Sequence, residues 1–132
     1  MTGYFVGEPV TYTSNNRELL AVIEAIFNYN DEAAENAELA KDASITGVAF
    51  EIMYLDADKQ IRFKSVSPVG AIAIYEDNIE EDLLYFIRYY DTKDIVTEKT
   101  TTIVEVYSRS EVITYHKEYA ASGLTLISQV SH

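Results

Sequence analysis

Two groups of carboxylates are the side chains in this sequence with the chemistry to bind a metal ion. Asp56-Ala-Asp58 has the spacing that opens an EF-hand calcium loop, but the sixth position of that loop is Ile61 rather than glycine and the twelfth is Ser67 rather than glutamate. The acidic segment 76–82 offers oxygens to a hard cation, although such runs are usually solvated loops. We therefore predict a turn at Asp56 and no metal site.

Acid–base catalysis would depend on the two histidines or on paired glutamates. His116 falls on a predicted strand, where a structural or exposed histidine is more common than a general base, and His132 is the last residue of the sequence. Glu80 and Glu81 are adjacent, so their side chains diverge instead of facing one substrate. There is no glycine-rich phosphate loop. The sequence predicts no catalytic residue and no cofactor.

The charge balance disfavours binding of duplex nucleic acid by this chain alone. The 132 residues include 22 Asp and Glu against 10 Lys and Arg, which gives a net charge of −12. A surface this acidic repels phosphate backbones, and the basic residues are scattered along the sequence. The absence of cysteine excludes disulfides and thiolate chemistry. No signal peptide or membrane-length apolar run is present, so we expect no membrane contact.

The elements that would position these side chains change from helical to strand periodicity across Gly47. Asn15 and Glu18 have capping-box spacing ahead of a helix over 16–28, and Asp31 is placed to cap a second helix that ends at Gly47. Alternating runs then predict strands over 48–55, 61–66, 69–75, 83–90, 100–107 and 111–117, with a short strand-like run over 124–127. Val104 and Val106 on one strand and Ile113 and Tyr115 on the next are expected to share an inner face. We predict one α+β domain over 1–132, with two N-terminal helices packed on a mostly antiparallel sheet of about six strands.

Four segments occur in an order that resembles one viral family. They are Gly3-Tyr-Phe-Val-Gly-Glu-Pro-Val-Thr-Tyr12, residues 40–56 with Ile45-Thr-Gly-Val-Ala-Phe50 at their centre, Ile72-Ala-Ile-Tyr-Glu-Asp77, and Ile87-Arg-Tyr-Tyr90. The ordered set is similar to the portal (head-to-tail connector) proteins of tailed bacteriophages and of prophages of Gram-positive bacteria. The resemblance covers most of residues 3–107 and is weaker in the tail.

This resemblance implies a structural function rather than an enzymatic one. Portal proteins form a ring, usually of twelve subunits, at one capsid vertex, and DNA passes through the ring during packaging and ejection. The implied partners are other portal subunits, the terminase, and capsid and head-completion proteins; the implied location is the virion, with the host cytoplasm during assembly. Residues 1–132 resemble the wing region, without stem, clip or crown. The isolated fragment is expected to be a monomer or weak oligomer without DNA affinity.

Two alternatives belong to other classes. The element order permits a small cone-like α+β enzyme or ligand-binding domain similar to relatives of nuclear transport factor two, which would need a deep pocket with His116 or Glu51 as base. An open sheet, or a pocket filled by tyrosines, would reject it. A plain interaction module outside any virus is the second alternative. For the portal interpretation, tyrosine-rich strand surfaces and Arg88 are the expected subunit contacts.

Overall fold

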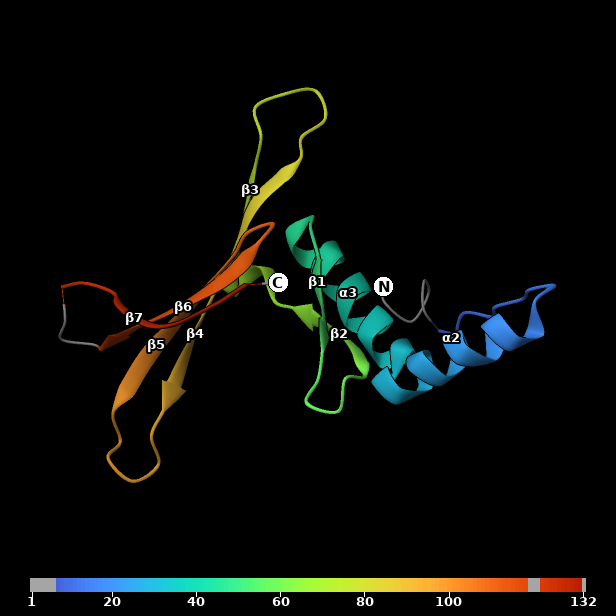
Figure 1. Ribbon diagram of the computed structural model, residues 1–132, viewed down its shortest axis with the longest axis horizontal. Helices are drawn as coiled ribbons and strands as arrows, with labels where there is room; N and C mark the ends of the chain where they lie inside the picture. Colours follow the sequence, from blue (N-terminus) through green and yellow to red (C-terminus); the bar gives the residue numbers. More distant parts are fainter. Residues whose placement is uncertain (1–6, 119–121, 132) are drawn as a thin grey trace. The chain divides into compact units, whose positions relative to one another are not determined.

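The computed structural model describes residues 7–118 and 122–131, and the chain divides into two compact units, Met1–Pro68 (unit 1) and Val69–His132 (unit 2). Figure 1 labels the elements. Unit 1 holds α2 (Arg17–Asn30), α3 (Glu32–Thr46), β1 (Phe50–Leu55) and β2 (Ile61–Val66). The 3₁₀ turn η1 (Pro68–Gly70) spans the division, and unit 2 then holds β3 (Ala71–Tyr75), β4 (Leu83–Lys93), β5 (Thr100–Tyr107), β6 (Glu111–Glu118) and β7 (Thr125–Ser131). Whether residues 1–132 fold as the single predicted domain stays a prediction.

The cap residue of helix α2 lies one position later in the sequence than the predicted cap, Asn15. The cap is Asn16, whose Oδ1 accepts a hydrogen bond from the Leu19 amide at 3.1 Å, so the pairing of Asn15 with Glu18 is wrong. The Ser14 hydroxyl oxygen accepts from the Asn16 amide at 3.1 Å. Residues 14–16 therefore do form the cap of this helix, with Asn16 rather than Asn15 in the cap position.

Helix α3 begins and ends at the predicted residues. Asp31 occupies the cap position with φ 53° and ψ 56°, but its side chain makes no capping hydrogen bond. This left-handed residue separates α2 from α3 without a longer linker. At the other end Gly47 adopts φ 80°, and its amide donates to the Ala43 carbonyl. The prediction of Gly47 as a left-handed helix exit is confirmed.

The small core of unit 1 lies where α2 packs on the β1–β2 hairpin. The two strands are antiparallel and pair from Phe50 with Val66 to Leu55 with Ile61, as the alternating pattern predicts. Phe63 and Val66 are the buried apolar residues of the described part of the chain. The Phe27 ring meets the Phe63 ring edge-on, with centroids 6.1 Å apart. Neither α2 nor α3, nor any other helix among the described residues, is long and apolar enough to cross a membrane.

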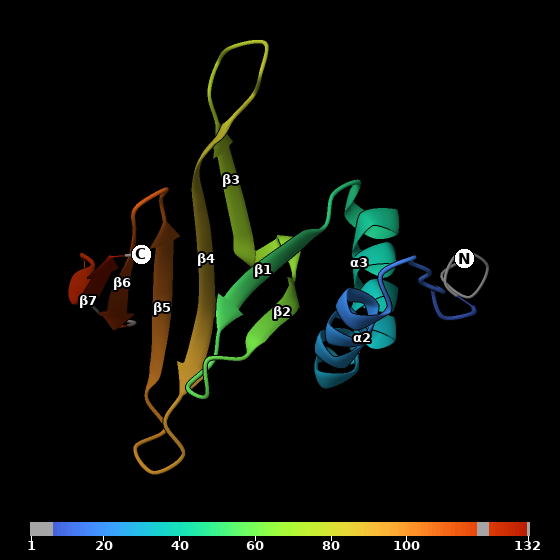
Figure 2. The ribbon, with the colours of Figure 1, turned by 45° about the vertical axis from the view of Figure 1, so that its right-hand side comes forward.

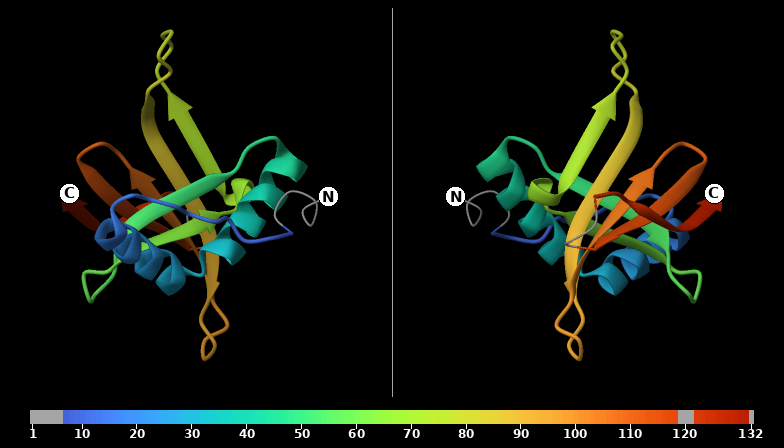
Figure 3. Two further views of the ribbon diagram at one scale, coloured as in Figure 1. Left: turned by 90° about the vertical axis from the view of Figure 1, so that its right-hand side faces the viewer. Right: turned by 90° about the vertical axis from the view of Figure 1, so that its left-hand side faces the viewer.

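Unit 2 is a five-stranded antiparallel meander in the order β3-β4-β5-β6-β7 (Figure 2). The register places Val104 opposite Tyr115 and Val106 opposite Ile113, so the predicted shared face is confirmed. The acidic segment 76–82 forms the loop between β3 and β4 (Figure 3). None of the described residues of unit 2 is fully buried.

The α+β class with antiparallel pairing is confirmed, with seven strands where about six were expected. The strands form two sheets rather than one continuous sheet. Pro68 offers a reason, since proline has no amide to continue a strand ladder and starts the η1 turn here. The strand beyond Glu118 is β7, longer than the predicted run at 124–127.

Candidate functional site

Asp56 organises the turn between β1 and β2, as predicted. Its Oδ1 accepts hydrogen bonds from the amides of Asp58 and Gln60, both at 2.9 Å, and its Oδ2 accepts from the Tyr29 hydroxyl at 3.0 Å. The Gln60 amide is the main reason that the pKa of Asp56 lies below its ordinary value. Because one carboxylate oxygen accepts from the turn and the other from Tyr29 of α2, Asp56 has a structural role here.

The acidic loop between β3 and β4 is also held by its own backbone. The Asn78 side-chain oxygen accepts from the amides of Glu80 and Glu81, at 3.0 and 2.8 Å. Asp82 pairs with Arg109 at 2.9 Å on the neighbouring part of unit 2. Across residues 7–118 and 122–131, no group of three or more His, Asp or Glu side chains is placed to hold a metal ion.

The two alternative bases considered for an enzyme belong to different units. His116 lies on β6, with Ile103 and Thr125 as its register partners, and Glu51 lies on β1 in the other unit. Burial, followed by the nearby charge of Glu35, raises the pKa of Glu51. His132 lies outside the described residues.

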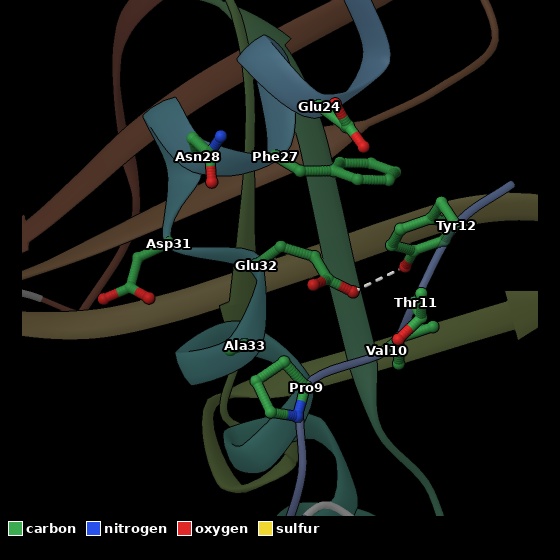
Figure 4. Close-up of a pocket in the computed structure, with 10 residues that line it drawn as sticks. All are labelled: Pro9, Val10, Thr11, Tyr12, Glu24, Phe27, Asn28, Asp31, Glu32 and Ala33. Atoms are coloured by element: carbon green, nitrogen blue, oxygen red, sulfur yellow. Dashed lines mark hydrogen bonds between the residues drawn. The ribbon is translucent and has the colours of Figure 1, made fainter. Parts of the chain in front are cut away.

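A pocket of about 450 Å³ lies in unit 1 between residues 9–12 and the two helices (Figure 4). The Tyr12 hydroxyl donates to Glu32 Oε1 at 2.7 Å, and its ring lies 4.8 Å from that of Phe27. This hydrogen bond is the main reason that the pKa of Tyr12 is raised. Neither His116 nor Glu51 lines the pocket, and its lining holds carboxylates without a basic side chain. The bases that the cone-like enzyme alternative requires are therefore absent from this pocket. It is lined by Pro9, Val10, Thr11, Tyr12, Glu24, Phe27, Asn28, Asp31, Glu32 and Ala33.

Buried Asn30, at the end of α2, closes part of the outer edge of β2. Its side-chain nitrogen donates to the carbonyls of Ile26 at 2.8 Å and Ile61 at 2.9 Å, while its oxygen accepts from the Phe63 amide at 3.1 Å. Only 5% of Asn30 is exposed. An amide side chain can serve both a donor and an acceptor of a strand edge, so Asn30 occupies the place of a neighbouring strand.

Buried Glu35 continues this closure two residues further along β2, at Ser65. Glu35 Oε2 accepts from the Ser65 amide at 2.8 Å, and Oε1 accepts from the ammonium group of Lys64. Burial alone would raise the pKa of Glu35, but the Lys64 hydrogen bond and the Ser65 amide lower it below its ordinary value. Asn30 and Glu35, which we call the edge clamp, together satisfy the outward carbonyl of Ile61 and the outward amides of Phe63 and Ser65.

Sequence reasoning missed the edge clamp, although one signal was available. Asn30 follows Ile26 and Phe27 at helical spacing, so it is a polar residue on the apolar stripe of α2. A polar side chain in such a position needs a buried partner. The partner lies 31 to 33 residues away on β2, and no local periodicity indicates it.

A second polar cluster joins β4 to β5 in unit 2. Glu105 Oε2 accepts from Arg88 at 2.9 Å and from the Tyr107 hydroxyl at 3.0 Å, while Oε1 accepts from the Tyr90 hydroxyl at 3.1 Å. The Arg88 guanidinium lies 4.2 Å from the centre of the Tyr90 ring. Burial, followed by the charge of Glu105, raises the pKa of Tyr107 to about 12. These contacts fix two strands to each other, and Arg88 as a subunit contact stays a prediction.

Comparison with known proteins gives two matches. The family model described as phage portal protein, SPP1 Gp6-like, matches residues 1–132. The portal protein of Bacillus phage SPP1 is 32% identical over 116 residues, which cover 88% of this chain and 23% of the phage protein. The chain thus spans less than a quarter of the length of that relative. The family is the one that the four ordered segments resemble, and the chain belongs to the SPP1 Gp6-like phage portal proteins.

Proposed function

We propose that this chain is part of the wing region of a portal subunit, and that its work is shape and assembly rather than catalysis. The observation that carries the proposal is the match of the portal family over all 132 residues, together with 32% identity to a curated portal protein. Portal proteins are structural components of virions that form oligomeric rings. The stem, clip and crown regions of such a subunit would lie outside residues 1–132.

The proposed partners follow from a complete portal ring. They are neighbouring portal subunits, the terminase, and capsid and head-completion proteins, with DNA passing through the channel. The surface of unit 2 supports partners of this kind, because large apolar side chains of its strands are 40% to 60% exposed. Apolar side chains exposed to this extent on several strands are expected where a surface is covered in an assembly. The exposed apolar residues on these strands include Ile72, Ile74, Tyr75, Tyr85, Tyr89, Leu126, Ile127 and Val130.

The contacts of three carboxylates support a non-catalytic chain. Asp56 is engaged by the β1–β2 turn, Glu35 by the edge of β2, and Glu105 by three donors from β4 and β5. Each of these carboxylates serves backbone or cross-strand hydrogen bonds. Family membership also argues against the cone-like enzyme and against a module outside any virus.

A chimeric portal protein tests the proposal. The 116-residue segment of the Bacillus phage SPP1 portal protein that matches this chain is replaced by the corresponding residues, and the purified chimera is viewed by negative-stain electron microscopy. We expect closed rings with the subunit number of the parent protein. A chimera from which the segment is deleted is the control, and we expect it to form no rings. A folded, soluble chimera that stays monomeric contradicts the proposal.

A further inference from the structure

The outer edge of β1 is open, whereas the outer edge of β2 is closed by the edge clamp. The Asp56 amide donates to the Gln60 carbonyl at 3.0 Å, which sets the alternation of hydrogen bonds along the hairpin. Tyr54 with Arg62, Ile52 with Lys64, and Phe50 with Val66 are then the hydrogen-bonded pairs. The amides and carbonyls of Glu51, Met53 and Leu55 therefore point away from β2.

Within the described part of unit 1, no strand or loop is hydrogen-bonded to this edge. No strand pairs with the outer side of β1, and the loop and cap hydrogen bonds of the described residues do not reach Glu51, Met53 or Leu55. Met53 is 68% exposed and Leu55 is 65% exposed. Edge strands are normally blunted by charged side chains, proline or a covering element, and β1 carries no lysine or proline, with Glu51 as its one charged residue. An open edge of this kind is a site for strand addition.

Unit 2 supplies a strand that suits such an edge. Its inner strands carry charges, including Arg88, Glu105 and Lys117, whereas its edge strands β3 and β7 carry none. This is the reverse of the usual protection, in which charges lie on the edges. Strand β7 has seven residues, all exposed, which matches the six residues of β1, while β3 is shorter and runs directly into the acidic loop.

The outer edge of β7 also has free backbone groups at defined positions. The Ser108 amide donates to the Glu111 carbonyl at 2.9 Å, which sets the hydrogen-bond alternation of β6. Val112 with Val130 and Thr114 with Ser128 are then the hydrogen-bonded pairs between β6 and β7. The Gln129 backbone points to the open side.

We propose that β1 of one copy of this chain accepts β7 of a second copy as a third strand. The proposal deepens the proposed function and rests on it, because a portal ring needs a head-to-tail contact that leaves both edges free for further copies. Each copy carries a net charge of −12, so copies repel one another. An uncharged strand such as β7 adds the least electrostatic repulsion when it approaches another copy. A single added strand buries little surface, so the contact is weak in solution.

Amide exchange measured by NMR over a range of protein concentrations tests the pairing directly. The amides of Ile52 and Tyr54 are expected to be protected at every concentration, because they bond to β2. The amides of Glu51, Met53, Leu55 and Gln129 are expected to become protected only as the chain associates. Three results would each overturn the proposal. The chain could associate without protecting these amides, the protection could be independent of concentration, or the chain could fail to associate at about millimolar concentration.

Substitutions at Met53 separate the backbone contact from the side chain. Met53→Pro removes an amide that β2 does not use, so the hairpin is retained while the added strand loses a donor. Met53→Thr keeps the amide and is the matched control. We expect concentration-dependent protection at Gln129 to be lost in M53P and kept in M53T, with Phe63 protected in both. Loss in both variants, or in neither, overturns the proposal.

Cross-linking uses the absence of cysteine from the chain. A Met53→Cys variant mixed with a Gln129→Cys variant is expected to give mixed disulfide dimers in excess over a Lys59→Cys and Gln129→Cys mixture. Equal yields in the two mixtures overturn the proposed contact. The chimera test measures ring formation only. If the chimera forms rings but the cysteine variants give no excess of mixed disulfide dimers, strand addition is refuted and the proposed portal function is retained.

Discussion

Asn30 and Glu35 do with two side chains what a third strand would do for β2. Together they accept or donate at Ile61, Phe63 and Ser65, and both residues are only 5% exposed. Polar groups this enclosed cost free energy unless each finds a partner, and no enclosed side-chain nitrogen or oxygen among the described residues lacks one. The edge clamp therefore both excludes a further strand from β2 and fixes the helices on the hairpin.

Asn30→Ala is expected to lower the free energy of unfolding of unit 1 by about 1–3 kcal/mol. The change removes three hydrogen bonds and leaves the Ile61 carbonyl and the Phe63 amide without their side-chain partner. Urea unfolding followed by far-ultraviolet circular dichroism measures the loss. Amide exchange should also show that the Phe63 amide loses its protection.

Asn28→Ala is the matched control for the edge clamp. Asn28 lies on the same helix, two residues earlier, and is exposed. We expect a change within about 0.5 kcal/mol, as for most surface substitutions. Equal effects of the two substitutions would show that β2 does not depend on Asn30.

Glu105→Gln is expected to lower the pKa values of Tyr107 and Tyr90 together. Both pKa values are raised by burial and then by the charge and hydrogen bonds of Glu105, and that of Tyr107 reaches about 12. Burial is the larger cause and persists in the variant, so the pKa of Tyr107 should fall below 12 and stay above the ordinary value of 10.0. NMR titration of ring-labelled tyrosine measures both values. The control Glu111→Gln changes a carboxylate on β6 and should move neither.

At the scale of elements, the contact between η1 and β4 leaves no room for a side chain at Gly70. A Cβ atom at this position would lie 2.7 Å from the Tyr89 carbonyl oxygen, which belongs to backbone and cannot swing aside. The Tyr89 hydroxyl also donates to the Val69 carbonyl at 2.8 Å, so β4 is held against this turn from two sides. Glycine is therefore required here for close packing.

Gly70→Ala should destabilise unit 2 by about 1–3 kcal/mol, as expected for overpacking. The readout is faster amide exchange in β3 and β4. Gly123→Ala is the control, because a Cβ atom there meets nothing within 4 Å. If the two substitutions behave alike, the approach of Tyr89 to η1 does not matter for the sheet.

Local patterns predicted most of the elements, because helices and hairpins are built from contacts between residues close in sequence. The exit at Gly47, the turn at Asp56 and the β5–β6 hairpin are of this kind. Strand β4 shows the limit. The alternating pattern predicts that this strand ends at residue 90, yet Asp91 to Lys93 continue it because β5 supplies their partners.

Cross-strand contacts explain that extension. The Thr102 hydroxyl donates to Asp91 at 2.6 Å, and the Thr92 hydroxyl donates to the Thr101 carbonyl at 3.1 Å. Polar residues can extend a strand when the neighbouring strand supplies their hydrogen-bond partners. A short stretch of sequence does not show which strand that neighbour is. The edge clamp was missed for the same reason, since Asn30 and Glu35 find their partners about thirty residues away.

At the scale of the whole chain, acidity dominates what approaches the protein from a distance. The described ion pairs engage four basic residues with carboxylates of the same chain: Lys41 with Glu38, Lys64 with Glu35, Arg88 with Glu105, and Arg109 with Asp82. The net charge of −12 remains after such pairing. Phosphate groups therefore meet a repelling field.

The isolated chain is accordingly expected to show no binding to a DNA duplex of roughly 20 base pairs, even at low salt, where attraction to phosphates is strongest. Fluorescence anisotropy of labelled duplex measures this. A strongly basic duplex-binding protein at the same concentration serves as the positive control, because each phosphate contact that it makes adds about 0.9 to the slope of log affinity against log salt. We expect binding by that protein alone, weakening as salt is raised. Tight, salt-sensitive binding by the unchanged chain would mean that local cations on a fixed surface outweigh the net charge, and the repulsion argument would be wrong.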